Sequence, residues 1–123
     1  MAPDKKLKIL IAEDDEVSEK LLELIVQKYC EKIFIATTGV EALEVCHNNL
    51  DLDLVLMDIK MPEMDGYEAS RQIREFNKDL IIIAQTAYAL DGDREIAMES
   101  GCNDYISKPI RKDKLIEVIN KYF

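Results

Sequence analysis

Five polar side chains stand at the ends of apolar runs, where they could act together on a phosphoryl group. They follow the first, third, fourth and fifth such runs and are Glu13, Asp14, Asp58, Thr86 and Lys108. A short apolar run bounded by Pro or Gly turn signals predicts a strand buried on both faces. Ligands of open α/β sheets lie just beyond the carboxyl ends of the strands, which is where these side chains fall. Acids, a hydroxyl and an ammonium fit phosphoryl chemistry, with an acyl phosphate formed on Asp58.

The acids at the first and third strand ends indicate a divalent cation. In a parallel sheet Glu13 and Asp14 would face Asp58. Two like charges about 4 Å apart repel by roughly 1 kcal/mol in water and by about 4 kcal/mol at an effective dielectric of 20. Mg²⁺ takes oxygen ligands, commonly one or two carboxylates with waters and a phosphate, and would offset this repulsion. Asp15 is expected only to cap the helix that follows.

The elements that would position these groups alternate along the chain. Strands are predicted at residues 7–12, 33–36, 52–57, 80–84 and 103–107, and the fourth, the most apolar, should be central. Five helices are predicted between and after them. Such alternation predicts an α/β fold with a parallel sheet covered by helices on both faces.

Helix signals lie at fixed offsets in the intervening segments. Thr38 with Glu41, and Asp65 with Glu68, suit helix starts. The predicted inward face of the first helix consists of Val17, Leu21, Leu24, Ile25 and Lys28, with the charge of Glu19 off that face. The fourth helix, about residues 90–99, offers little inward beyond Leu90, Ile96 and Ala97, so it should be weakly anchored and able to move.

Composition excludes several classes of protein. The chain has 123 residues and a net charge of −9, which suits one domain that does not bind nucleic acid. No apolar run approaches the roughly 18 residues of a membrane span, and no signal peptide is visible. The scattered cysteines show no metal spacing and predict reduced thiols in a cytoplasmic protein. Residues 1–6 are polar and are expected to be a frayed or expression-derived terminus, and residues 7–123 the domain.

With these groups in view, the chain resembles the receiver domain of response regulators in two-component signalling. The resemblance spans about Lys8 to Phe123, and the motif sequences are most similar to those of receivers of hybrid sensor histidine kinases. The matching motifs are Ile-Leu-Ile-Ala-Glu-Asp-Asp (9–15), Leu-Met-Asp-Ile-Lys-Met-Pro-Glu-Met-Asp-Gly-Tyr-Glu (56–68), Gln-Thr-Ala-Tyr-Ala (85–89) and Gly-Cys-Asn-Asp-Tyr-Ile-Ser-Lys-Pro-Ile (101–110).

The resemblance implies a flavodoxin-like, doubly wound, three-layer fold with strand order 2-1-3-4-5 and five helices. A chemotaxis member of the same family is a well-known example of this strand order. The resemblance also implies a phosphorelay in which Asp58 accepts a phosphoryl group from a phosphohistidine. The donor would be a histidine kinase or histidine phosphotransfer domain, and an output or kinase domain could lie in the same full-length chain.

The family's site roles carry over residue by residue. Glu13, Asp14, Asp58 and the backbone carbonyl of Lys60 match the ligands of Mg²⁺ (or Mn²⁺). Thr86 matches the switch hydroxyl, Tyr105 the switch aromatic, and Lys108 the lysine before a proline whose bond is usually cis. The surface formed by helix four, strand five and helix five would change on phosphorylation. Such a domain catalyses only its own phosphotransfer and slow dephosphorylation.

Two positions vary freely in the family, two residues after the acceptor and two after the switch threonine. Here they are Lys60 and Tyr88. We expect their long or bulky side chains to restrict water at the acyl phosphate and so to set its lifetime.

Two other classes of protein share parts of this pattern. A hydrolase with an aspartyl nucleophile, like haloacid-dehalogenase-type phosphatases, would carry a second Asp where Lys60 stands and would have a cap insertion. A flavodoxin-like cofactor binder would want a glycine- or hydroxyl-rich loop after strand one, but the acids at 13–16 would repel a phosphate.

Overall fold

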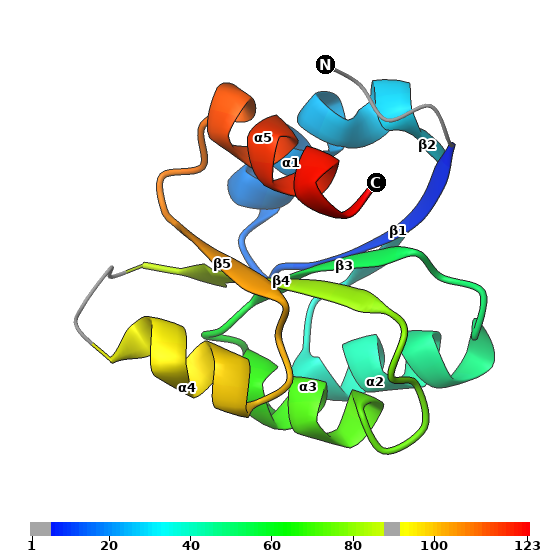
Figure 1. Ribbon diagram of the computed structural model, residues 1–123, viewed down its shortest axis with the longest axis vertical. Coiled ribbons are helices and arrows are strands. Elements are labelled where there is room, and N and C mark those ends of the chain that lie inside the picture. The colour runs from blue at the N-terminus through cyan, green and yellow to red at the C-terminus, as the bar shows by residue number, and fades with distance from the viewer. Residues whose placement is uncertain (1–5, 88–91) are drawn as a thin grey trace.

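A single parallel sheet with helices on both faces forms the molecule (Figure 1). The computed structural model describes residues 6–87 and 92–123. The strands are β1 (Leu7–Ala12), β2 (Cys30–Ala36), β3 (Leu54–Asp58), β4 (Ile81–Thr86) and β5 (Asp104–Ser107). The described helices are α1 (Glu16–Val26), α2 (Gly39–Asn48), α3 (Gly66–Ile73), α4 (Asp93–Glu99) and α5 (Lys112–Tyr122), with a short 3-10 helix at Gln27–Tyr29.

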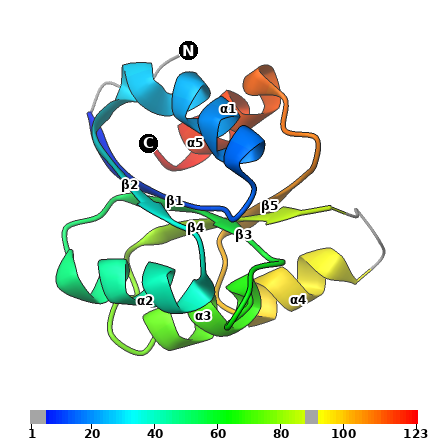
Figure 2. The same ribbon diagram turned by 180° about the vertical axis from the view of Figure 1, so that it is seen from behind.

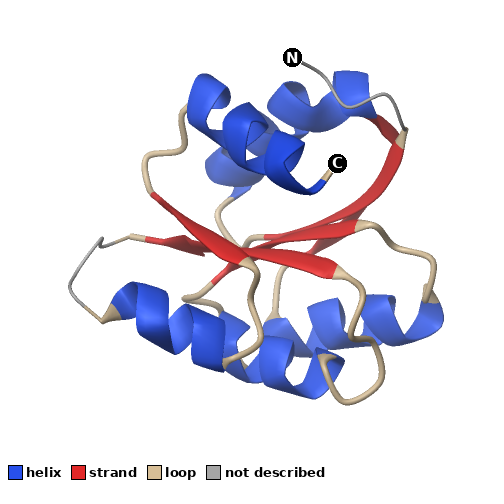
Figure 3. Cartoon of the chain, viewed as in Figure 1, coloured by secondary structure: helices blue, strands red, loops and turns tan. Residues whose placement is uncertain are grey.

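The strand order is β2-β1-β3-β4-β5, and every neighbouring pair is parallel. Helices α1 and α5 cover one face, while α2, α3 and α4 cover the other (Figures 2 and 3). This confirms the predicted α/β class, the three layers and the order 2-1-3-4-5. The apolar β4 lies inside the sheet between β3 and β5, although the middle strand is β3.

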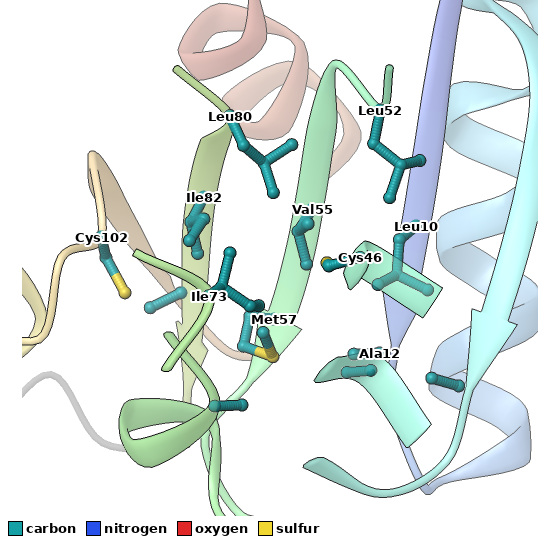
Figure 4. Packing of buried hydrophobic residues seen from close by; sticks show 14 of the residues in the cluster. Leu10, Ala12, Cys46, Leu52, Val55, Met57, Ile73, Leu80, Ile82 and Cys102 are labelled. Atoms are coloured by element: carbon teal, nitrogen blue, oxygen red, sulfur yellow. The ribbon is translucent and has the colours of Figure 1, made fainter. Parts of the chain in front are cut away.

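Both faces of the sheet are packed because successive side chains of a strand point to opposite sides. On one face, Val55 and Met57 join the cluster under α2 and α3, with Ile73 pressed against them (Figure 4). On the other, Leu54 and Leu56 join the cluster under α1 and α5. All five residues of β3 are buried, so its carboxyl end is held from both sides.

Side-chain caps begin the first three helices, as predicted. The carboxylate of Asp15 accepts a hydrogen bond from the Ser18 amide at 2.9 Å. Thr38 Oγ1 accepts from the Glu41 amide at 3.0 Å, and Asp65 Oδ1 accepts from the Glu68 amide at 2.9 Å. Each cap satisfies an amide that the first turn of a helix leaves unpaired.

The predicted inward face of α1 was wrong except at Ile25, which is buried. Val17 and Leu24 are 78% and 64% exposed, and Leu21 is exposed as well. The helix instead buries a neighbouring stripe that consists of Glu19, Leu22, Ile25 and Val26. The helix carries two apolar stripes, and periodicity alone does not say which of them packs on the sheet.

Helix α4 is the least embedded of the described helices. Its buried set is Ala97 alone, Ile96 is 44% exposed, and no side chain caps its first turn. This agrees with the predicted weak anchoring, although the prediction that Ile96 faces inward was wrong. Leu90 and Tyr88 lie outside the described residues. Within residues 6–87 and 92–123, none of the helices combines the length and apolar character needed to cross a membrane.

Candidate functional site

Three carboxylates meet at the carboxyl edge of the sheet. Glu13 follows β1 and Asp58 ends β3, two strands that pair directly, with Ala12 opposite Met57. One oxygen from each of Glu13, Asp14 and Asp58 lies within 4.8 Å of the others. Glu13 and Asp58 are 1% and 4% exposed, whereas Asp14 is exposed. The three acids therefore lie together, as the ends of the predicted strands indicated.

Lys108 bridges the two buried acids. Its Nζ lies 3.0 Å from Glu13 Oε1 and 3.2 Å from Asp58 Oδ1. Burial and the adjacent Glu13 carboxylate raise the pKa of Asp58 to about 7, although Lys108 opposes this. Burial acts to lower the pKa of Lys108, but the carboxylates outweigh it and the pKa is raised overall. Two buried acids that share one ammonium are a local excess of negative charge, which a divalent cation with oxygen ligands fits.

A cleft of about 470 Å³ opens over these groups. Its lining combines five of the predicted residues with four others and consists of Asp14, Asp58, Ile59, Lys60, Tyr67, Thr86, Ala87, Asp93 and Lys108. Thr86 is 8% exposed and Lys60 is exposed. Acids, ammonium and hydroxyl are thus brought together from four strand ends.

Backbone contacts fix the position of Asp58. The Ile59 amide donates to Gln85 O at 3.1 Å, and the Gly66 amide donates to Ile59 O at 2.9 Å. A Cβ at Gly66 would lie 2.3 Å from the carbonyl oxygen of Asp58, so only glycine allows this approach. The Lys108 amide donates to Thr86 O at 2.7 Å, and the Lys108–Pro109 bond is cis, as the resemblance implied.

Tyr105 lies apart from the cleft. It lines a different cavity of about 430 Å³ between α4, β5 and α5, together with Arg94. The Arg94 guanidinium stands 5.8 Å from the centre of the Tyr105 ring. Tyr88, the other aromatic predicted for the site, lies outside the described residues.

Sequence reasoning missed two polar residues of the cleft, Asp93 and Tyr67. Asp93 Oδ2 accepts a hydrogen bond from Thr86 Oγ1 at 3.4 Å. Tyr67 follows Gly66 in the first turn of α3, and burial together with Asp93 raises the pKa of its hydroxyl. The motif around Gly66 already contained Tyr67, but Asp93 lies seven positions after Thr86 in the sequence, and no spacing rule connects the two.

The fold and the cleft define a class, that of doubly wound α/β proteins with an acidic site at the carboxyl edge of the sheet. The family model described as response regulator receiver domain matches residues 9–120. The chain therefore belongs to the response regulator receiver domain family. This membership favours a phospho-accepting role over the hydrolase and the cofactor binder.

Relatives agree with this family. Hybrid signal transduction histidine kinase I of Dictyostelium discoideum is 41% identical over an alignment of 121 residues, which covers 92% of this chain but only 7% of that protein. The polar-differentiation response regulator DivK of Brucella anthropi is 34% identical over 116 residues, which are 93% of this chain and 94% of that protein.

Solved structures show the same fold. The receiver domain of Saccharomyces cerevisiae Ssk1, crystallised with the histidine phosphotransfer protein Ypd1, superposes with a TM-score of 0.89 at 32% identity, covering 96% of this chain and 89% of that one. The receiver domain of a Pseudomonas aeruginosa sensor histidine kinase has a TM-score of 0.83 at 31% identity over 95% and 97% of the chains. That domain holds a magnesium ion in its active-site cleft.

Proposed function

We propose that this chain is a phospho-accepting signalling domain in which Asp58 takes a phosphoryl group from a partner's phosphohistidine. The supporting observation is the pair of buried acids, Glu13 and Asp58, bridged by Lys108 at one edge of the sheet. In the reaction a carboxylate oxygen of Asp58 bonds to phosphorus as the phosphorus–nitrogen bond breaks and the partner's imidazole leaves.

The residues of the cleft have complementary roles. The raised pKa of Asp58 leaves its carboxyl partly protonated near neutral pH, and the adjacent ammonium of Lys108 favours the ionised form that attacks. After transfer, the ammonium of Lys108 would pair with the phosphoryl oxygens. Lys60, at the mouth of the cleft, and Tyr88 would restrict water and lengthen the life of the acyl phosphate.

Magnesium fits the acidic set. Glu13, Asp14 and Asp58 with the backbone carbonyl of Lys60 would hold Mg²⁺ or Mn²⁺, with Asp14 on the exposed side. The bound ion would neutralise phosphoryl oxygens and offset the mutual repulsion of the carboxylates.

Thr86 and Tyr105 would transmit the change. Thr86 would donate its hydroxyl to a phosphoryl oxygen, and Tyr105 would turn inward into the space that Thr86 leaves. The surface formed by α4, β5 and α5 would then differ between the two states, and a partner would read it. Inverting a 1:99 population needs about 5.5 kcal/mol, most of which one or two charge-assisted hydrogen bonds of about 1.5–3 kcal/mol supply.

The exposed stripe of α1 supports a docking role for the phosphate donor. Val17, Leu21 and Leu24 fall on one side of the helix and are exposed. Leu21 also lines a cavity of about 380 Å³ with Pro109 and Lys108, next to the acidic cleft. An apolar helix surface of a histidine kinase or histidine phosphotransfer domain would cover this stripe and bring its phosphohistidine to Asp58.

The setting of this function is proposed on the same grounds. Residues 7–123 would form the receiver domain, and the protein would act in the cytoplasm. A kinase or output domain would lie in the same chain or in a partner, as in the hybrid kinase to which this chain is similar.

Phosphorylation with a small phosphodonor and MgCl₂ tests the proposal. Intact mass should rise by one PO₃ group in wild type and in Asp51→Asn, an exposed aspartate at the other end of the sheet. Asp58→Asn should show no increase, and a chelator should abolish the reaction in every variant. An unchanged mass for wild type, or a full increase for Asp58→Asn, would refute the assignment.

Leu21→Glu tests the docking surface. Transfer from a phosphorylated histidine phosphotransfer domain should slow at least tenfold, about 1.4 kcal/mol, because a charge then opposes burial of the stripe. Labelling by the small phosphodonor should be unaffected. Leu50→Glu, at a residue that is 65% exposed beyond the end of α2, is the matched control and should transfer normally. Equal transfer to both variants would place docking elsewhere.

A further inference from the structure

Two consecutive residues at the start of α4 contact both switch residues. Asp93 accepts the hydrogen bond of the Thr86 hydroxyl at 3.4 Å. Arg94 stands over the Tyr105 ring and lies 3.8 Å from the Asp104 carboxylate. The weakly embedded α4 is therefore tied at its first turn to the residues proposed to move.

Asp93 also faces the phosphorylation site. It lines the same cleft as Asp58 and Lys108, which makes it a further acid of that cleft beyond the cation ligands. A phosphoryl group on Asp58 adds about −1.5 to −2 charge and three acceptor oxygens. It would repel Asp93 and at the same time compete with it for the Thr86 hydroxyl.

The competition favours the phosphoryl group. A bond from a hydroxyl to a charged oxygen is shortest and strongest near 2.5–2.7 Å, so the 3.4 Å contact to Asp93 is weak and easily replaced. Little opposes a shift of α4, since Ala97 is its one buried residue among those described.

We propose that Asp93 is a positioning residue that holds Thr86 in the unphosphorylated arrangement, and that its repulsion by the phosphoryl group releases the start of α4. This rests on the proposed function of Asp58. On this proposal Asp93 opposes activation in two separable ways, through its contact with Thr86 and through its negative charge.

Two substitutions separate the parts. Asp93→Asn keeps an oxygen that accepts from Thr86 but removes the charge, whereas Asp93→Ala removes both. Glu95→Gln is the matched control, because it makes the same charge change in the same turn of α4 at an exposed residue. The probe is beryllofluoride with MgCl₂, which mimics a phosphoryl group, and its dissociation constant and the amide resonances of residues 104–107 are measured by NMR.

Asp93→Ala should bind beryllofluoride about fivefold more tightly or better, and Asp93→Asn about twofold. Without beryllofluoride, the resonances of Asp93→Ala should move part of the way to their bound positions. Glu95→Gln should match wild type in both measurements. In a Thr86→Val background the difference between Asp93→Ala and Asp93→Asn should vanish, which a general loosening of α4 would not produce.

Unchanged affinity and resonances in Asp93→Ala would overturn the proposal, as would a difference between the two variants that persists in the Thr86→Val background. If Asp93→Ala does not fold, the affinity of Asp93→Asn against Glu95→Gln decides the charge part. Labelling of Asp58 by the phosphodonor is scored separately. Its failure in wild type removes the proposed function, whereas labelling without any effect at Asp93 removes only this inference.

Discussion

Two regions border the cleft and are built differently. One is the edge where β1 and β3 end, at Glu13 and Asp58, and the other is the corner where α4 packs on β5, which reaches the cleft through Asp93. At the edge, Glu13 follows β1 and Asp58 ends β3, and both strands are buried along almost their whole length. At the corner, α4 buries Ala97 alone and is joined to the sheet by polar contacts of Asp93 and Arg94. The carboxylates are thus held rigidly where the phosphoryl group would bind. Helix α4, which would respond, is held by polar contacts that an added negative charge can weaken.

The largest expected effect is a contrast in core energetics. Leu56→Ala in β3 should lower the free energy of unfolding by about 2–5 kcal/mol, because it leaves a cavity between packed layers. Ile96→Ala in α4 should lower it by less than about 1 kcal/mol, since this side chain is 44% exposed. Urea denaturation of both variants measures the contrast. Equal losses would mean that α4 is anchored as firmly as the sheet.

A second prediction concerns pH and the charge stored at the edge. The pKa of Asp58 is about 7 in the fold, above its ordinary value, so the folded protein keeps a proton that the unfolded chain loses. This stabilisation is present below about pH 4 and is lost as pH rises through about 7. Asp58→Asn removes the titration. Its stability relative to metal-free wild type should therefore rise from pH 5 to pH 8, by on the order of 2 kcal/mol.

Urea denaturation at both pH values, with and without MgCl₂, measures this difference. Excess MgCl₂ should restore wild-type stability at pH 8, since it binds the ionised acids. Asp51→Asn should show no comparable rise, because that aspartate is exposed. If the difference in stability between Asp58→Asn and wild type does not change with pH, the pKa of Asp58 is not raised in the fold.

The smallest effect is expected at Gln85, which connects the two regions. It pairs with Asp58 on one side and with Ile106 on the other. Its side chain is 1% exposed, and its amide atoms have no hydrogen-bond partner among the described residues. Gln85→Leu should therefore raise the free energy of unfolding by about 1 kcal/mol, measured by urea denaturation, with phosphodonor labelling of Asp58 intact. A loss of stability would mean that the amide is satisfied in solution.

Strand ends were the part of this site most open to prediction. The sequence pattern located Glu13, Asp58, Thr86 and Lys108 because apolar runs and turn signals mark where a buried strand stops. Parallel pairing then does the rest, since it brings the ends of separate strands to one edge.

Orientation across elements was less predictable. The apolar stripe of Val17, Leu21 and Leu24 was predicted to face the core but faces solvent, because helical period does not fix which stripe meets the sheet. Asp93 was missed because its contact with Thr86 depends on how α4 lies against the end of β4, which no sequence pattern indicates. Both errors fall on surfaces proposed here to meet a partner or to move, where packing constrains the sequence least.

The absence of a side chain at Gly66 sets how closely α3 approaches Asp58. Its lack of a side chain leaves room for the carbonyl of Asp58, and its amide donates a hydrogen bond to the carbonyl oxygen of Ile59, the residue after Asp58. The start of α3 therefore fixes the position of the Asp58 peptide. One added methyl group at Gly66 would collide with the carbonyl oxygen of Asp58 and would displace the carboxylate that is proposed to accept the phosphoryl group.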